Sequence, residues 1–298
     1  MGYGKWSSTD YATYRRSYAG KSRDDIFTSN KHRRIDPKLD PFRIGMRESR
    51  DSAEHPNSLA IGLFLDVTGS MGHIPHDLVA NQLGSMMDTL TDHGVQSPQL
   101  MFSAVGDHRC DKAPLQVGQF ESSTQLVNDG LRRLFLEGGG GDAPESYLMA
   151  WHAAARHTSI DCWEKRQQKG FLFTVGDDTS HHQFEANFQS TIFGYDQAKT
   201  VSDRQLLLEV SERYHVFHIQ VGKNQQQTAN ARVANYWAPL LGKNFITLPD
   251  SKQLGLLVAM VAAIMTGSPA AGAMKGHLPG SPSPWRPALI HIPVPTPP

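Results

Sequence analysis

Long apolar runs and helical periodicities alternate along most of this chain, and the alternation predicts strands and helices in turn. The segment Leu59–Gly72 begins with an unbroken apolar run, LAIGLFL, which is typical of a strand buried on both faces of a parallel sheet. His73–Gly94 then places its apolar residues on one helical face and ends at a glycine. Later strands are predicted at Gln99–Asp107, Lys169–Asp177, His215–Gly222 and Asn244–Pro249, with a short antiparallel edge strand at Pro114–Phe120.

Helices are predicted between these strands. One of them begins at Asp142, because Asp142 and Glu145 resemble a capping box. The others are expected at Ser122–Phe135, Ser202–Tyr214, Thr228–Leu241 and Lys252–Thr266. Strands that alternate with helices predict an α/β fold. We therefore expect a doubly wound, mostly parallel six-stranded sheet with one short antiparallel edge strand and helices on both faces.

The composition divides the chain into three parts. Residues 1–57 are polar, with 12 basic and eight acidic residues and no long apolar run, and we expect a loosely ordered arm there. Its arginines and tyrosines could contact nucleic acid, but an arm whose aromatic side chains pack on the body is favoured. Residues 58–266 are expected to form the α/β domain. Residues 267–298 hold nine of the 18 prolines and predict a disordered tail.

Charge and cysteine content narrow the function. The formal net charge is zero, with 29 basic and 29 acidic residues, which argues against a broad surface for nucleic acid. The two cysteines form no disulfide framework, so a cytoplasmic protein is expected. The apolar run Leu254–Thr266 is too short to span a bilayer, and no membrane association is expected.

Oxygen-bearing side chains follow the first buried strand at regular spacing. Asp66, Thr68 and Ser70 lie at i, i+2 and i+4 on a tight turn, a pattern that suits a hard cation such as Mg²⁺. The carboxyl ends of parallel strands share one edge of the sheet, so Asp107, Asp177 and the glycine loop 138–142 should lie near this turn. Carboxylates gathered there would repel one another without a cation. The sequence therefore predicts a metal site at this edge.

The segment Asp66-Val-Thr-Gly-Ser70 resembles the DxSxS motif of von Willebrand factor A domains, with threonine in the middle position. The resemblance covers about residues 58–266 and implies a doubly wound sheet with a metal-ion-dependent adhesion site that holds Mg²⁺, or Mn²⁺ in its place. It is closest to the intracellular bacterial or phage type.

The remaining ligands are implied less directly. The family takes a threonine from the loop before the next helix, where this chain has GGGGDAPE (138–145), similar to a GGGDxPE form. Asp142 is the first choice there, with Glu145 and Ser146 as alternatives. The family's last acid corresponds to Asp177, or alternatively to Asp178. The resemblance thus implies one ligand set: Asp66, Thr68, Ser70, Asp142 and Asp177.

The family resemblance implies an interaction domain rather than an enzyme. A partner protein would complete the metal shell with an acidic side chain, and family members of this type often serve AAA ATPases of the MoxR kind. The alternative is a haloacid dehalogenase-like phosphohydrolase, because FLDVTG and a later GDD are similar to its motifs. That chemistry needs an acid two residues after the nucleophile, where this chain has Thr68.

One other loop mixes possible metal ligands. The segment Asp107–Asp111, DHRCD, could bind a softer metal, but its spacing matches no zinc pattern and a polar hairpin loop is the favoured interpretation. His181 and His182 follow Asp177 closely and are expected near the rim of the site.

Overall fold

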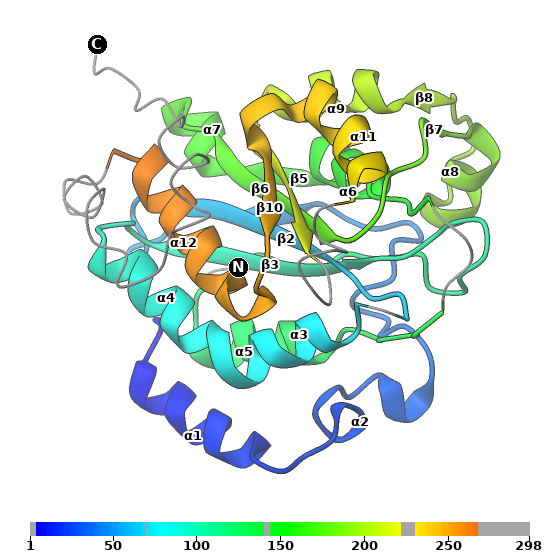
Figure 1. Cartoon of the computed structure of the whole chain (residues 1–298). Coiled ribbons are helices and arrows are strands. Elements are labelled where there is room, and N and C mark those ends of the chain that lie inside the picture. The colour runs from blue at the N-terminus through cyan, green and yellow to red at the C-terminus, as the bar shows by residue number, and fades with distance from the viewer. Residues whose placement is uncertain (1–3, 70, 140–143, 222–229, 268–298) are drawn as a thin grey trace.

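The computed structural model describes residues 4–69, 71–139, 144–221 and 230–267. Its centre is a six-stranded sheet in the order β10-β9-β6-β2-β3-β4, parallel except for the edge pair β3–β4 (Figure 1). The doubly wound α/β fold predicted above is confirmed. The strands are β2 (Leu59–Asp66), β3 (Pro98–Val105), β4 (Leu115–Gln116), β6 (Gly170–Gly176), β9 (Tyr214–Val221) and β10 (Phe245–Leu248).

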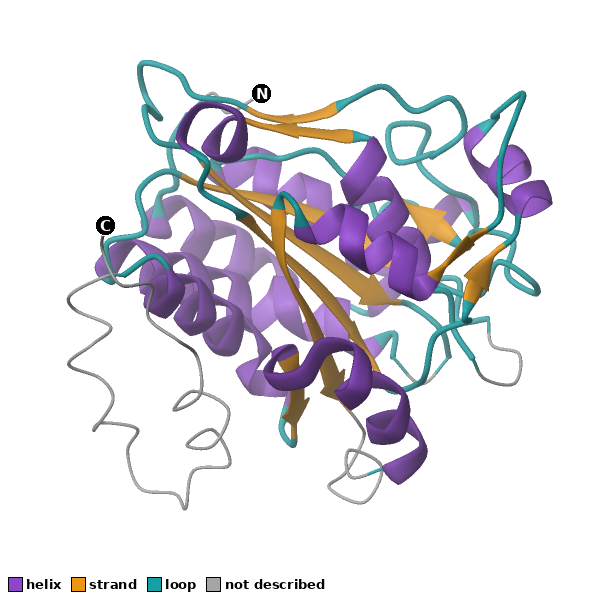
Figure 2. Ribbon diagram, turned by 90° about the horizontal axis from the view of Figure 1, so that it is seen from above, coloured by secondary structure: helices purple, strands orange, loops and turns teal. Residues whose placement is uncertain are grey.

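Helices cover both faces of this sheet, as Figures 1 and 2 show. Every residue of β2, β3 and β6 is therefore buried, which explains their unbroken apolar sequences. One face carries α3 (His73–Asp77), the π-helical η2 (Leu78–Gln82), α4 (Leu83–Asp92), α5 (Thr124–Arg132) and α12 (Leu254–Met265). The other carries α6 (Leu148–Arg156), α7 (Asp161–Arg166), α9 (Asp203–Ser211) and α11 (Ala231–Leu241).

The helix predicted to begin at Asp142 starts instead at Leu148. Residue Glu145 forms a parallel β-bridge with Ser180, in which its N–H donates to Thr179 O at 3.0 Å and its carbonyl accepts from His181 N at 3.0 Å. These bonds hold the backbone extended at Glu145, so no capping box forms at this residue. Asp142 itself lies outside the described residues.

The N-terminal segment is folded rather than loosely ordered, which makes that expectation wrong for residues 4–57. It contains α1 (Ser8–Tyr18) and α2 (Arg23–Ile26), which lie beneath α4 and α5 in Figure 1. The predicted aromatic packing is confirmed, because Tyr11 and Tyr18 are buried in the core cluster. Their hydroxyls donate to Val79 O at 2.6 Å and Asn128 Oδ1 at 2.7 Å.

Short elements complete the architecture, and the sequence pattern predicted none of them. β1 (Arg47–Ser49) pairs in parallel with β5 (Thr158–Ile160). An excursion after β6 contains β7 (Gln183–Phe184), α8 (Ala186–Phe193) and β8 (Val201–Ser202). Single 3-10 turns lie at η1 (Asn30–His32), η3 (Gly242–Asn244) and η4 (Ser251–Gln253). Among the described residues, every helix is too short or too polar to cross a membrane.

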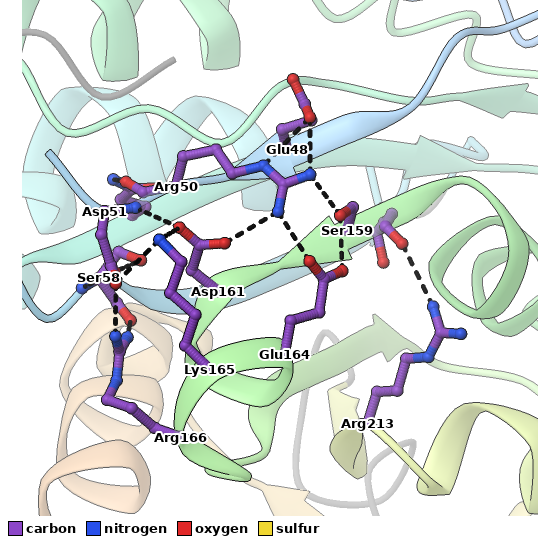
Figure 3. A network of polar contacts seen from close by, with 12 residues as sticks. Glu48, Arg50, Asp51, Ser58, Ser159, Asp161, Glu164, Lys165, Arg166 and Arg213 are labelled. Carbon is purple, nitrogen blue, oxygen red and sulfur yellow. Dashed lines mark hydrogen bonds and ion pairs between the residues drawn. The ribbon is translucent and has the colours of Figure 1, made fainter.

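A charged network ties the segment before β2 to α7 (Figure 3). Arg50 lies at its centre: Nη1 donates to Asp161 Oδ1 at 2.9 Å and to Glu164 Oε2 at 2.8 Å, and Nη2 donates to Glu48 Oε1 at 2.7 Å. The Asp161 side chain is only 4% exposed, so its negative charge needs stabilisation by these partners more than the charge of a surface carboxylate does.

We expect Arg50→Ala to lower the free energy of unfolding by about 1–3 kcal/mol, because it leaves a buried acceptor short of a charged donor. Urea denaturation measures this loss. Lys165→Ala is the matched control, since Lys165 contacts the same Asp161 at 2.7 Å but is 57% exposed. The control should lose less than about 1 kcal/mol. Equal losses in the two variants would show that Arg50 stabilises the fold no more than the exposed Lys165 does.

Candidate metal centre

Asp66 is the last residue of β2 and its carboxylate is held from two sides. The backbone N–H and the hydroxyl of Thr68 donate to Oδ1 at 2.8 Å and 2.6 Å. The hydroxyl of Tyr147, at the start of α6, donates to Oδ2 at 2.6 Å. Asp66, Thr68 and Tyr147 are all buried. The strand end and the helix start therefore fix the orientation of one carboxylate.

Gly176 makes room for this arrangement. A Cβ atom at Gly176 would lie 1.7 Å from the Tyr147 hydroxyl oxygen and 2.4 Å from the ring carbon that bears it. Only a residue without a side chain fits at this position of β6. The last residue of β6 thus supports the hydrogen bond that Tyr147 makes to Asp66.

Acidic side chains gather around Asp66. Burial, with a smaller contribution from the negative charge of Asp177, raises the pKa of Asp66 to about 7. Burial, together with the charge of Asp66, raises the pKa of Glu145 to about 9. One oxygen of Glu145, Oε2, is buried and has no hydrogen-bond partner among the described residues. A buried, unpartnered carboxylate oxygen beside two more acids is the environment that a bound cation would stabilise.

The first two glycines of the loop 138–142 lie against the same turn. Gly69 N donates to Gly139 O at 2.6 Å, and Gly138 N donates to Val67 O at 3.3 Å. Two residues of the predicted ligand set, Ser70 and Asp142, lie outside the described residues. The others, Asp66, Thr68 and Asp177, lie at the carboxyl ends of the adjacent strands β2 and β6.

The alternative ligands that the sequence left open have different partners in the structure. Glu145 acts electrostatically on the Asp66 site, whereas Ser146 faces away and its hydroxyl donates to Asp107 Oδ1 at 3.1 Å. Asp178 forms a two-pronged ion pair with Arg232 of α11, at 2.8 Å and 2.9 Å. The negative charge of Asp177, by contrast, contributes to the raised pKa of Asp66.

A second group of ligand atoms lies nearby, at the end of β3. Asp107 Oδ1 lies 2.8 Å from His181 Nε2 and 3.9 Å from His108 Nδ1. All three residues are buried, and their ligand atoms lie within 4.8 Å of one another. This group could hold a metal ion. The sequence points to Asp107 and His181 separately but does not indicate their contact, because β2 separates β3 from β6 in the sheet.

An open cavity of about 630 Å³ adjoins this second group. Its walls come from the loop after β3, the excursion after β6 and helix α11. The charged and aromatic residues that line it are Arg109, His181, His182, Glu185, Arg232 and Tyr236. Two clusters of metal-ligand atoms therefore lie at this edge of the sheet, and the polar cavity adjoins one of them.

Comparisons with known proteins give structural likenesses only. No family model and no curated protein sequence matches the chain. The pilus adhesin SpaC from Lactobacillus rhamnosus GG, in its open conformation, aligns at 8% identity over 74% of this chain and 30% of its own, with a TM-score of 0.48. A von Willebrand factor type A protein from Catenulispora acidiphila aligns at 11% identity over 70% of this chain and 42% of its own, with a TM-score of 0.38.

An aerotolerance-related membrane protein from Bacteroides fragilis aligns at 12% identity over 67% of this chain and 96% of its own, with a TM-score of 0.35. The present chain thus spans less than half the length of SpaC and of the Catenulispora protein. The α/β fold of this chain rests on its strand order and register, not on these likenesses.

Proposed function

We propose that this chain is a metal-dependent protein-interaction domain of the von Willebrand factor A type. In this proposal Asp66, Thr68, Ser70 and Asp177 hold Mg²⁺, and the loop 138–146 adds a carboxylate from Asp142 or Glu145. The supporting observation is the convergence of acids at the ends of β2 and β6, where Asp66 and Glu145 are buried and one Glu145 oxygen lacks a partner among the described residues. All of these ligands are oxygen donors, which suit a hard cation.

The proposed partner is a protein that presents an acidic side chain. A bound Mg²⁺ supplies a hard centre that retains exchangeable water, and a partner carboxylate can replace one such water. The extra acid at 142 or 145 should hold the metal more tightly and weaken its pull on an acidic ligand. We further propose the intracellular bacterial or phage type, a cytoplasmic location, and an AAA ATPase of the MoxR kind as the partner. Mn²⁺ can take the same ligands.

We propose no enzymatic activity for this site. A phosphohydrolase would need a second acid two residues after Asp66. This chain has Thr68 at that position, and its hydroxyl donates a hydrogen bond to Asp66 Oδ1 at 2.6 Å. A phosphatase assay tests this directly. Release of phosphate that depends on Mg²⁺ and disappears in Asp66→Asn would overturn the interaction proposal in favour of a hydrolase.

Metal titration tests the ligand assignment. We expect calorimetry to show Mg²⁺ or Mn²⁺ binding that weakens by more than about 100-fold in Asp66→Ala, since removal of a carboxylate that merely orients a ligand already costs about 10–100-fold. Asp178→Asn is the matched control, because Asp178 is the neighbouring acid and is paired with Arg232. Its affinity should stay near that of the wild type. Circular dichroism checks that each variant folds.

Capture of a partner forms the second half of this test. In the presence of Mg²⁺ the wild-type chain should retain a partner protein, and EDTA should release it. Asp66→Ala should not bind this partner, whereas Asp178→Asn should still bind it. Equal metal affinity in the wild type and Asp66→Ala would contradict the site, and capture that ignores EDTA would contradict the metal dependence.

A further inference from the structure

The cluster at the end of β3 differs chemically from the Asp66 site. Asp107 and His108 follow β3, and His181 comes from the bridge after β6. Two imidazole nitrogens and one carboxylate are the ligand set of borderline transition metals, whereas Mg²⁺ prefers oxygen alone. Because their ligand atoms differ, the two clusters would select different kinds of metal ion.

The spacing of the three ligand atoms fits a small tetrahedral ion. Zinc binds nitrogen and oxygen at about 2.0–2.1 Å, so ligand atoms around it lie about 3.3 Å apart. Here Asp107 Oδ1 lies 2.8 Å from His181 Nε2 and 3.9 Å from His108 Nδ1. These two distances lie on either side of the tetrahedral spacing, and the ligand atoms of all three residues lie within 4.8 Å of one another.

The surroundings supply the outer contacts that metal-binding histidines need. With Nδ1 of His108 on a metal, its Nε2–H points at Glu185 Oε2, which lies 3.2 Å away. Glu185 is itself fixed by Arg109 Nη2 at 2.5 Å. A carboxylate behind the second ring nitrogen orients a metal-bound imidazole and makes it more basic.

The segment 145–147 keeps the two clusters apart. Its backbone is extended at Glu145, so successive side chains point to opposite sides. The Tyr147 hydroxyl donates to Asp66, and the charge of Glu145 interacts more strongly with Asp66 than with Asp107. The hydroxyl of Ser146 contacts Asp107 and lies 2.5 Å from His108 Nδ1. Each cluster thus has its own ligands.

We propose that Asp107, His108 and His181 form a second metal site, selective for a borderline ion such as Zn²⁺ and separate from the Asp66 site. The site supplies three protein ligands. The adjoining cavity, lined by His181 and Glu185, is open to a water or an exogenous ligand at the fourth position. This proposal does not rest on the proposed interaction function.

Zinc binding to the full chain tests the proposal, with Zn²⁺ itself as the probe in competition with a chromophoric chelator. The wild type should bind one equivalent, and His181→Gln and Asp107→Asn should weaken the binding by more than about 100-fold. Glu185→Gln removes only the outer contact and should weaken it by about 10-fold. His182→Gln is the matched control, because that side chain is 79% exposed and contacts Asp203 instead.

A second readout keeps the test independent of variant folding and of the Asp66 site. Co²⁺ in place of Zn²⁺ should give the visible absorption of a tetrahedral nitrogen-ligated ion in the wild type and in Asp66→Ala, but not in His181→Gln. Zinc affinity that is the same in the wild type, His181→Gln and Glu185→Gln would show a metal-free hydrogen-bonded cluster and overturn the proposal. Loss of zinc binding in Asp66→Ala with its fold intact would also overturn it, because the two sites would then be one.

Discussion

Gly176→Ala is expected to destabilise the fold by about 3 kcal/mol or more, at the upper end of what overpacking of a protein core costs. The new methyl group would lie 1.7 Å from the Tyr147 hydroxyl oxygen. The Tyr147 ring is fully buried against His218 and Trp237, with ring centroids 4.9 Å and 5.7 Å away, so it has little room to move. Urea denaturation measures the loss. Metal affinity should fall as well, because a displaced Tyr147 releases Asp66.

Two further variants test whether the loss comes from the clash with Tyr147 or from the exchange of glycine for alanine as such. In a Tyr147→Leu background the ring atoms that clash are absent, so the added cost of Gly176→Ala should be smaller by about 2 kcal/mol. Gly130→Ala is the control for the exchange itself, because Gly130 lies inside α5 and a Cβ atom there would meet nothing within 4 Å. That exchange should stabilise the chain by about 0.5–1 kcal/mol. Additive losses in the double variant would contradict the clash.

The sequence predicts the central sheet well because its strands are buried on both faces. A strand such as β2 must be apolar at every position, and a run of that kind is visible without any tertiary information. The two-residue strands β7 and β8 are too short to show a period. The sequence does not predict that the N-terminal segment is folded, for another reason. The segment has no apolar run, and its buried Tyr11 and Tyr18 donate hydrogen bonds to residues of the α/β domain.

The sequence predicts which strand ends lie next to each other, because topology alone decides that. It misses contacts between segments that are far apart in the chain. Asp66 and Asp177 end adjacent parallel strands, so the strand-end rule brings them together. Asp178 pairs with Arg232, which lies on α11, 54 residues further along the chain, so no local pattern indicates this ion pair. His181 reaches Asp107 over 74 residues of sequence, and no local spacing indicates that contact.

Acidification from about pH 7 to about pH 5 is expected to cost the fold about 2 kcal/mol through each of two buried histidines, His152 and His218. Burial, with a smaller contribution from the charge of Arg156, lowers the pKa of His152 to about 2. Burial alone lowers the pKa of His218 well below its ordinary value. Below about pH 6.5 the unfolded chain protonates both rings while the folded chain does not, so stability is lost as the pH falls.

Single variants isolate this effect from the acids of the Asp66 site, which act in the opposite direction. Asp66 and Glu145 have pKa values raised to about 7 and about 9, so without metal the folded state binds their protons and gains stability on acidification. Unfolding free energies from urea titrations at several pH values should therefore be compared between the wild type and His218→Gln. The slopes of the variant and the wild type should differ by one proton, about 1.4 kcal/mol per pH unit, with the variant losing less stability as the pH falls. His182→Gln, at a side chain 79% exposed, should keep the wild-type slope. Parallel curves for the wild type and His218→Gln would mean that His218 is charged in the folded protein, which its stacking on Trp237 at 3.8 Å and its complete burial argue against.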